Sequence, residues 1–191
     1  MIDESIRRLN LGCGFDLRPD SVNADNFPEC NPDLLLDIEQ PDWPFDDNRF
    51  DHVLMKHVLE HVGKDFATFT RVMQNLHRIV SPGGILEIHV PHYRHETYWS
   101  DPTHVRAFTA LTFRMMSKRQ NDEWIANRAN YTMLSYVMGV DFEMKSAVQV
   151  YDNAYVAMMN KGKLSKDEVR RMADQNWGVV RELKFELTVV K

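Results

Sequence analysis

The sequence predicts one α/β domain built around a mostly parallel sheet, and two observations carry that prediction. The first hundred residues consist of short apolar runs separated by Gly, Pro, Asn and Asp, a pattern typical of buried strands. Between the last two of these runs, apolar side chains recur at helical spacing from residue 66 to residue 80. A strand, a helix and a strand joined by tight turns indicate a right-handed parallel crossover, and 191 residues fit a single such domain, 1–191.

Seven strands and several helices follow from this pattern. In the first part, strands are expected at residues 8–11, 21–24, 34–36, 52–55 and 85–90, and a Ser-Pro-Gly-Gly turn at 81–84 ends the intervening helix. Past Pro91 the sequence predicts helices at 108–116, with Thr109 as the cap, and at 124–137. Strands at 142–150 and 179–190 complete the sheet, and Ser165 with Glu168 forms a capping-box signature that opens a helix between them.

Composition excludes several classes of protein. Hydrophobic residues make up 43% and charged residues 27%, which is typical of a globular chain with a packed core. The net charge of −5 argues against a nucleic-acid partner bound by general electrostatic attraction. No apolar run reaches the roughly 18 residues of a membrane helix, and the start of the chain lacks an apolar signal segment. With only Cys13 and Cys30 present, a disulfide framework is excluded and a cytoplasmic location without a membrane partner is expected.

The two halves of the chain differ in charge. Residues 1–100 carry 9 basic and 17 acidic side chains, a net charge of −8, whereas residues 101–191 carry 14 and 11, a net charge of +3. The two halves are therefore expected to have different functions.

A glycine pair and two aspartates point to a nucleoside ligand. Gly12 and Gly14 follow the first expected strand directly, where the backbone bends tightly and approaches a ligand. The lysine of a phosphate-cradling loop and the third glycine of the dinucleotide fingerprint are both missing. Asp25 and Asp37 end the second and third strands, at the edge of the sheet where ligands bind. Carboxylates there accept hydrogen bonds from a ribose diol and from an adenine amino group.

Six segments in order resemble the class I S-adenosylmethionine-dependent methyltransferases, particularly the small methyltransferase type 11. They are 9–14 (LNLGCG), 23–25 (NAD), 37–38 (DI), 43–51 (WPFDDNRFD), 57–62 (HVLEHV) and 76–84 (LHRIVSPGG), and the resemblance covers residues 7 to about 92 and the two late strands. It implies a Rossmann-like, three-layer α/β fold with a mostly parallel seven-stranded sheet, an antiparallel last strand and a helical cap after the fifth strand. It also implies an enzyme that uses S-adenosylmethionine as its cofactor.

The resemblance implies a cofactor site at the strand ends. The chain departs from many members of the family at two positions, since Asn10 stands where an acidic residue is common and Asp16 stands where a third glycine is common. The implied contacts are Gly12, Cys13 and Gly14 at the methionine part, Asp25 and Asn26 at the ribose, Asp37 and Ile38 at adenine, and Lys56 and His57 near the sulfonium.

The segment His57-Val58-Leu59-Glu60-His61 also matches H-x-x-E-H, a zinc peptidase pattern in which two histidines on one helical face bind metal. That pattern needs a long helix, yet here it follows directly on an apolar strand and precedes Gly63. We therefore expect no metal site and keep the zinc hydrolase as a third interpretation. A non-catalytic binding protein with the same cofactor fold is the main alternative to the methyltransferase.

The acceptor is expected to bind between the cofactor and the second half of the chain. Residues 93–140 are rich in aromatic side chains and are interpreted as an acceptor-binding cap, with 152–178 as an insertion between the last two strands. A hydroxyl or amine acceptor must lose a proton, and an imidazole accepts one near neutral pH. The sequence thus predicts an O- or N-methyltransferase for a small-molecule or saccharide acceptor. The candidate bases are His57, His61 and His104, and the candidate acceptor contacts are Tyr93, Trp99, Asp101 and Arg106.

Overall fold

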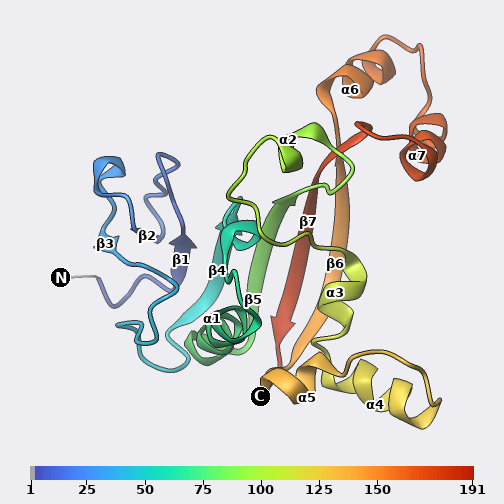
Figure 1. Cartoon of the computed structure of the whole chain (residues 1–191). Coiled ribbons are helices and arrows are strands. Elements are labelled where there is room, and N and C mark those ends of the chain that lie inside the picture. Colours follow the sequence, from blue (N-terminus) through green and yellow to red (C-terminus); the bar gives the residue numbers. More distant parts are fainter. Residues whose placement is uncertain (1–2) are drawn as a thin grey trace.

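The computed structural model describes residues 3–191, and its strands form one seven-stranded sheet in the order β3-β2-β1-β4-β5-β7-β6 (Figure 1). β7 runs antiparallel to both of its neighbours, and the other pairs are parallel. The predicted fold class is confirmed, including the reversed last strand. The strands are β1 (Arg8–Leu11), β2 (Val22–Asp25), β3 (Leu34–Leu35), β4 (Phe50–Lys56), β5 (Val80–Pro91), β6 (Phe142–Tyr151) and β7 (Val180–Val189).

The strand order reverses direction at β1 and β4. From β1 the chain proceeds outward through β2 to β3, and from β4 it proceeds the other way to β5. Where the order reverses, the loops after neighbouring strands separate and leave a crevice at their carboxyl ends. The loops after β1 and β4 therefore define where a ligand binds in this sheet.

Helix α1 (Phe66–Ile79) packs against the sheet as predicted (Figure 1). Asp65 caps it by accepting a hydrogen bond from the Thr68 amide at 2.9 Å. The chain then enters β5 at Val80, so the expected turn at 81–84 is part of an irregular strand start rather than a loop. Burial of each large apolar side chain on the sheet contributes about 2 kcal/mol, and the buried ones are Phe69, Val72, Met73, Leu76 and Ile79.

No α-helix lies between β1 and β4 in the described chain, and loops complete the third layer there. Asn23 of β2 is buried and holds these loops with its side chain: its Oδ1 accepts from the Arg18 amide at 2.8 Å, and its Nδ2 donates to the Arg18 carbonyl at 3.0 Å. Asn10 of β1 donates to Asn23 Oδ1 at 3.1 Å and to the Asp16 carbonyl at 2.8 Å. Asp33 accepts from Asn23 Nδ2 at 2.9 Å. A buried polar network thus replaces the packing of a crossover helix.

Four short helices follow β5: α2 (Glu96–Trp99), α3 (Ala110–Arg114), α4 (Lys118–Ala126) and α5 (Leu134–Met138). Thr109 caps α3 as predicted. The single helix expected at 124–137 is wrong, because the chain leaves α4 at Asn127 and Arg128 adopts a left-handed φ of 52°. The loop turns back so that Tyr131 packs on Trp124, with 4.4 Å between their ring centroids.

The last crossover carries α6 (Asn153–Asn160) and α7 (Lys166–Gln175) between β6 and β7, where the insertion was expected. Ser165 forms the predicted capping box with Glu168. In Figure 1, α2, α6 and α7 lie at the end of the sheet where the parallel strands finish. None of the described helices is long and apolar enough to cross a membrane.

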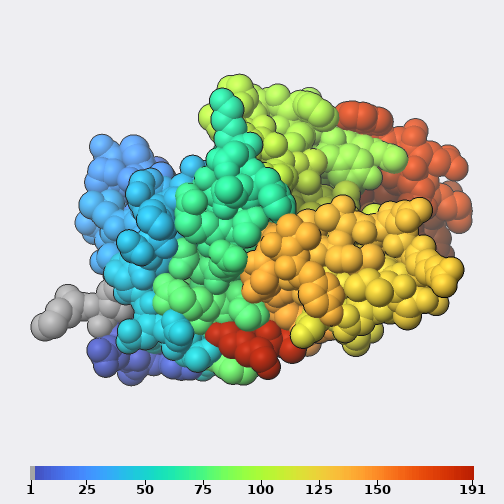
Figure 2. Space-filling view, turned by 60° about the horizontal axis from the view of Figure 1, so that its bottom comes forward, coloured from blue at the N-terminus to red at the C-terminus, as the bar shows by residue number. Residues whose placement is uncertain are grey.

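The segment expected as a cap, 93–140, divides between the two ends of the sheet. Its first part follows β5 at the carboxyl ends of the strands, whereas α4 and α5 lie at the other end (Figure 1). Figure 2 shows this second part beside α1, with the C-terminal residues between them. A hydrogen bond from Gln74 Nε2 to the Met138 carbonyl at 2.7 Å fixes it there, and one between His77 Nε2 and the Val190 carbonyl at 2.8 Å joins α1 to the C-terminal residues. Only the first part of the expected cap is therefore placed to meet a ligand.

Candidate functional site

A cavity of about 790 Å³, here called the first cavity, opens at the carboxyl ends of β1, β2 and β4. This is the point where the strand order reverses, and its size lies within the range of roughly 300–1,000 Å³ for small-molecule sites. Every residue expected to contact a cofactor lines it. These are Gly12, Cys13, Gly14, Asp25, Asn26, Asp37, Ile38, Lys56 and His57.

The two glycines shape the floor of the first cavity in different ways. Gly12 has a φ of 70°, and a Cβ on it would lie 2.3 Å from Val58 Cγ2, so only glycine allows the loops after β1 and β4 to meet. Gly14 has a φ of 50°, and a Cβ on it would meet no atom within 4 Å. Its backbone thus faces open space, as the close approach of a ligand requires.

Asp25 ties this glycine loop to β2. Its Oδ2 accepts from the Gly14 amide at 2.7 Å, and its Oδ1 accepts from the Phe27 amide at 2.9 Å. Each carboxylate oxygen has a second lone pair, so both oxygens still accept hydrogen bonds from a ligand diol. Asp37 at the other wall is exposed and holds the Glu39 amide at 2.9 Å. Two carboxylates held by backbone amides thus face the first cavity.

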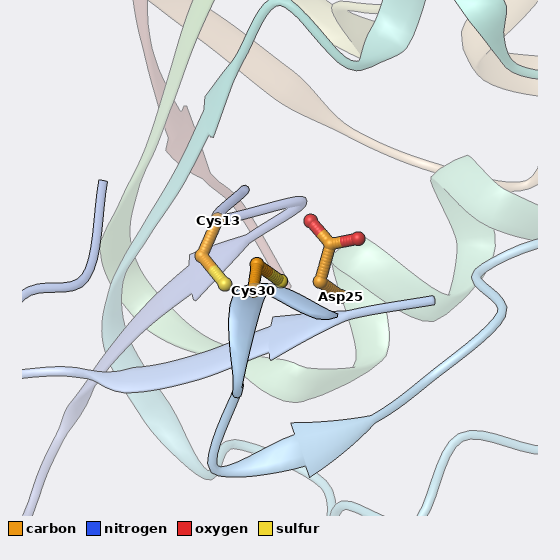
Figure 3. A group of neighbouring side chains, drawn as sticks. All are labelled: Cys13, Asp25 and Cys30. Carbon is orange, nitrogen blue, oxygen red and sulfur yellow. The ribbon is translucent and has the colours of Figure 1, made fainter. Parts of the chain in front are cut away.

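Two cysteines lie behind this wall. Cys13 and Cys30 are buried free thiols beside the Asp25 carboxylate, and one ligand atom of each of the three lies within 4.8 Å of the others (Figure 3). Burial, followed by the neighbouring Cys30 and Asp25, raises the pKa of the Cys13 thiol to about 12. Because metals bind the thiolate, this environment disfavours a metal site here.

A second cavity of about 490 Å³ adjoins the first and shares Lys56, His57 and His61 with it. The segment after β5 and the start of β7 supply its other walls. Lys56 lies at the boundary, where its Nζ is 3.3 Å from Asp16 Oδ2. The residues that complete the second cavity are Glu60, Pro91, Thr97, Asp101, His104, Arg181 and Glu182.

His57 stands between the two cavities in a strained backbone conformation, with a φ of 56°. A non-glycine residue in this region is uncommon and costs on the order of 1 kcal/mol, and here its amide donates to the His89 carbonyl at 2.8 Å. The ring places Nε2 2.9 Å from Glu182 Oε2 and Nδ1 3.5 Å from Glu60 Oε1. The hydrogen bond to Glu182, then the nearby Glu60 carboxylate, raises the pKa of His57 to about 9.

Glu182 is the acidic partner in this pair and comes from the last strand. Burial opposes its ionisation, but the hydrogen bond with His57 and the charge of Lys184 lower the pKa of Glu182 to about 2. His57 and Glu182 therefore form an ion pair at neutral pH. Glu182 was missed from sequence because it lies 125 positions beyond His57; the signal was an acid at a buried position of an apolar strand.

His61 and His104 meet beside Glu60 in the second cavity. Their rings pack edge to face with 4.6 Å between centroids, and His104 Nε2 lies 4.0 Å from Glu60 Oε1. The H-x-x-E-H segment is not a long helix, because it consists of the turn at His57 and the 3₁₀ helix η2 (Leu59–His61). The two histidines of that pattern thus do not stack on one helical face.

The four predicted acceptor contacts lie in different places in the structure and do not line one cavity. Asp101 lines the second cavity and accepts from Thr103 Oγ1 at 2.6 Å. Trp99 lines a different hollow of about 630 Å³ beside Trp177. Tyr93 stacks on His92 at 4.4 Å. Arg106 packs over the Phe69 ring at 4.3 Å and donates to the Gly63 carbonyl at 2.7 Å, which is the environment of a structural anchor.

Sequence comparison assigns the region around the first cavity to a family. The family described as a methyltransferase domain matches residues 9–88, which contain the glycine loop, both aspartates and the segment after β4. Among curated proteins no significant match is found.

Solved structures share the fold at low sequence identity. A SAM-dependent methyltransferase from Archaeoglobus fulgidus is 14% identical with a TM-score of 0.57, covering 97% of this chain and 87% of that chain. A chain in the complex of the Haloferax volcanii Trm112 methyltransferase activator with a methyltransferase is 16% identical with a TM-score of 0.59, covering 100% and 84%. The N-methyltransferase NodS from Bradyrhizobium japonicum WM9 is 15% identical with a TM-score of 0.54, covering 96% and 85%.

Proposed function

Because residues 9–88 match the methyltransferase-domain family, we propose that the protein is a class I S-adenosylmethionine-dependent methyltransferase that methylates an oxygen or nitrogen of a small-molecule or saccharide acceptor. The observation that carries this proposal is the pair of adjoining cavities that share Lys56, His57 and His61. One cavity holds the cofactor, and the other presents the acceptor to it. The unpaired thiols of Cys13 and Cys30 agree with a cytoplasmic enzyme.

The first cavity fits S-adenosylmethionine by its own geometry. The open backbone at Gly14 gives the methionine part room, and the free lone pairs of Asp25 accept the ribose hydroxyls. Asp37 and Ile38 lie on the adenine side. When bound there, the cofactor supplies an electrophilic methyl group on a sulfonium.

The second cavity contributes position and proton handling. Methyl transfer is an in-line displacement, so holding the acceptor atom against the methyl group supplies a large part of the acceleration. We assign the loss of the acceptor's proton to the imidazoles of His57, His61 and His104, which all line this cavity. His57 already carries a proton at neutral pH because of Glu182, so His61 and His104 are the two with a role below about pH 9.

Cofactor binding tests the first half of the proposal. Asp25→Asn keeps the shape of the side chain but replaces a charged acceptor, so the demethylated cofactor should bind about 10- to 100-fold more weakly by calorimetry. Asp42→Asn changes an exposed carboxylate outside both cavities and is the control. Its affinity for the demethylated cofactor should equal that of the wild-type protein. Equal affinities for the unchanged protein and Asp25→Asn would refute the assigned ribose contact.

Turnover tests the second half. The protein is incubated with methyl-labelled cofactor and panels of saccharides, phenols and amines, and label transfer is measured. Transfer that is lost in His61→Ala and His104→Ala while cofactor affinity is kept supports the assigned roles. Tight cofactor binding without transfer to any class of acceptor favours the non-catalytic binding protein instead.

A further inference from the structure

The carboxylate of Glu60 is buried in the wall of the second cavity without hydrogen bonds. The residue is 1% exposed, and neither of its carboxylate oxygens accepts a hydrogen bond from a described residue. Its backbone is fixed, since its carbonyl accepts from the Val105 amide at 2.9 Å. The nearest positive charge is His57, whose Nδ1 lies 3.5 Å from Glu60 Oε1 and whose Nε2 is already paired with Glu182. Glu60 therefore has only a share of this one charge, and because a buried carboxylate without hydrogen bonds is costly, it has room for a further cationic partner.

The His104 ring presents a lone pair to that carboxylate. Its Nδ1 lies 2.6 Å from the Tyr98 carbonyl, and a carbonyl only accepts, so Nδ1 carries the proton. In the neutral ring Nε2 is therefore unprotonated, and it lies 4.0 Å from Glu60 Oε1. Two acceptor atoms thus face one another across a gap, an arrangement that a cation between them would stabilise.

His61 is held in the same tautomer by a longer chain of hydrogen bonds. Thr103 Oγ1 donates its single proton to Asp101 Oδ1 at 2.6 Å, so it accepts from His61 Nδ1 at 2.8 Å. The lone pair of His61 then lies on Nε2. Histidines that bind metals commonly donate their other ring N–H to a carbonyl or to a hydrogen-bonded oxygen, which orients the ring and raises its basicity.

We propose that Glu60, His61 and His104 bind a divalent cation of the zinc type in the second cavity. One ligand atom from each lies within 4.8 Å of the other two. Ligand atoms in a tetrahedral zinc site with bonds of about 2.0–2.2 Å are roughly 3.4 Å apart, so small side-chain rotations close the site. Three protein ligands leave a fourth position for a substrate, as in catalytic zinc sites. Two imidazoles favour zinc or a similar transition metal over magnesium or calcium.

This inference rests on the proposed function for its chemistry and makes the acceptor a hydroxyl. A hydroxyl oxygen at the fourth position of the cation becomes acidic and gives its proton to solvent water. The resulting alkoxide or phenolate oxygen bonds to the methyl carbon as the bond from that carbon to sulfur breaks. The products are a methyl ether and S-adenosylhomocysteine. His61 and His104 would then act on the acceptor's proton through the cation that they hold.

A second carboxylate in the chain provides a matched control. Glu87 also lies between two histidines, but its Oε2 is 3.0 Å from His52 Nε2 and its Oε1 is 2.7 Å from His89 Nε2. Both oxygens are thus hydrogen-bonded without a metal. Glu87→Gln and Glu60→Gln make the same chemical change in a satisfied and an unsatisfied carboxylate.

Zinc and cobalt titrations of the chelator-treated full chain, without cofactor, test the site. We expect one Zn²⁺ per chain in competition with a chromophoric chelator, and visible absorption from tetrahedral Co²⁺ at one equivalent. Glu60→Gln and His104→Ala should weaken zinc binding at least about 100-fold, and Glu87→Gln should not change it. Absence of stoichiometric binding, or equal affinity in Glu60→Gln, would overturn the proposal.

Separate readouts keep the two proposals apart. Circular dichroism and binding of the demethylated cofactor show that each variant is folded. Stoichiometric zinc binding that Glu60→Gln weakens stands even if no methyl transfer is found. Cofactor binding and turnover that survive full removal of metal would overturn the cation's role in the reaction and leave the methyltransferase intact.

Discussion

The two cavities share three residues but are built in opposite ways. The walls of the first come from one continuous stretch of chain, residues 10–62, and its carboxylates are held by backbone amides. The walls of the second come from three separate segments, 56–61, 91–104 and 181–182, and its key pairs join side chains far apart in sequence, such as His57 with Glu182. The first cavity should therefore depend on local folding, and the second on the packing of the late strands.

We expect the largest effect on stability from a change at Asn23, which tests whether the first cavity depends on local folding. Replacement by Ala removes the buried hydrogen bonds that hold the loop 12–20, leaving backbone groups unpaired, and should lower the free energy of unfolding by about 3 kcal/mol. The affinity of the variant for the cofactor should fall as well. Urea unfolding measures the first and calorimetry the second. Asn160→Ala, at an exposed position of α6, is the control; equal stability of the two variants would show that loops do not replace the missing helix.

The next effect separates the two cavities by function. Glu182→Gln removes the charge that pairs with His57, and turnover should fall about 10- to 100-fold while the dissociation constant of the cofactor changes less than about threefold. Steady-state kinetics and calorimetry provide both values. Glu186→Gln lies four residues further along β7 and should leave both unchanged. A parallel loss of cofactor affinity in Glu182→Gln would mean that the cavities are one energetic unit.

A smaller loss of stability is expected from a change in α7, which lies outside the first cavity. Ser165→Ala removes the capping box of α7, on the side of the late strands, and should cost about 1 kcal/mol in urea unfolding. Cofactor affinity should stay the same, because α7 does not line the first cavity. Ser165→Asp supplies another capping oxygen and should restore most of the loss. Failure of Asp to do so would contradict capping as the cause.

The smallest effect is a pH dependence at the joint between β5 and α2. Burial, then the charges of Arg94 and His95, lowers the pKa of His92 from 6.5 to about 4. The unfolded chain therefore takes up a proton that the folded chain refuses, and stability falls as pH drops from about 6.5 to 4. At pH 6 the loss should be less than about 1 kcal/mol.

His92→Asn isolates this contribution. Asn offers an oxygen where His92 Nδ1 accepts from the Arg94 amide at 3.1 Å, and it does not titrate. Urea midpoints between pH 7 and 4.5 should fall less steeply in the variant than in the unchanged protein. Parallel curves would show that His92 is not the group responsible.

Local patterns predicted the first cavity and failed at the second. Glycines after β1 and acids at the ends of β2 and β3 are close in sequence and lie at the same sheet edge, so the nine expected cofactor contacts all line one cavity. Their roles toward the cofactor remain a prediction. Glu182 and Thr97 reach the second cavity through tertiary packing, which no short pattern encodes.

Helix boundaries show the same limit. The helix of 66–79 was predictable because its apolar face and its ending are local, and the cap at Thr109 and the capping box at Ser165 were found for the same reason. The break between α4 and α5 was not, because it depends on Tyr131 folding back onto Trp124.

The position of β7 between β5 and β6 also governs when each part of the protein can assemble. β6 is made before β7, yet β7 is its only neighbour in the described sheet, so β6 has no strand to join until the final strand leaves the ribosome. The strands that form the first cavity pair with one another and do not depend on β7. A nascent chain can thus complete its cofactor edge well before Glu182 arrives beside His57.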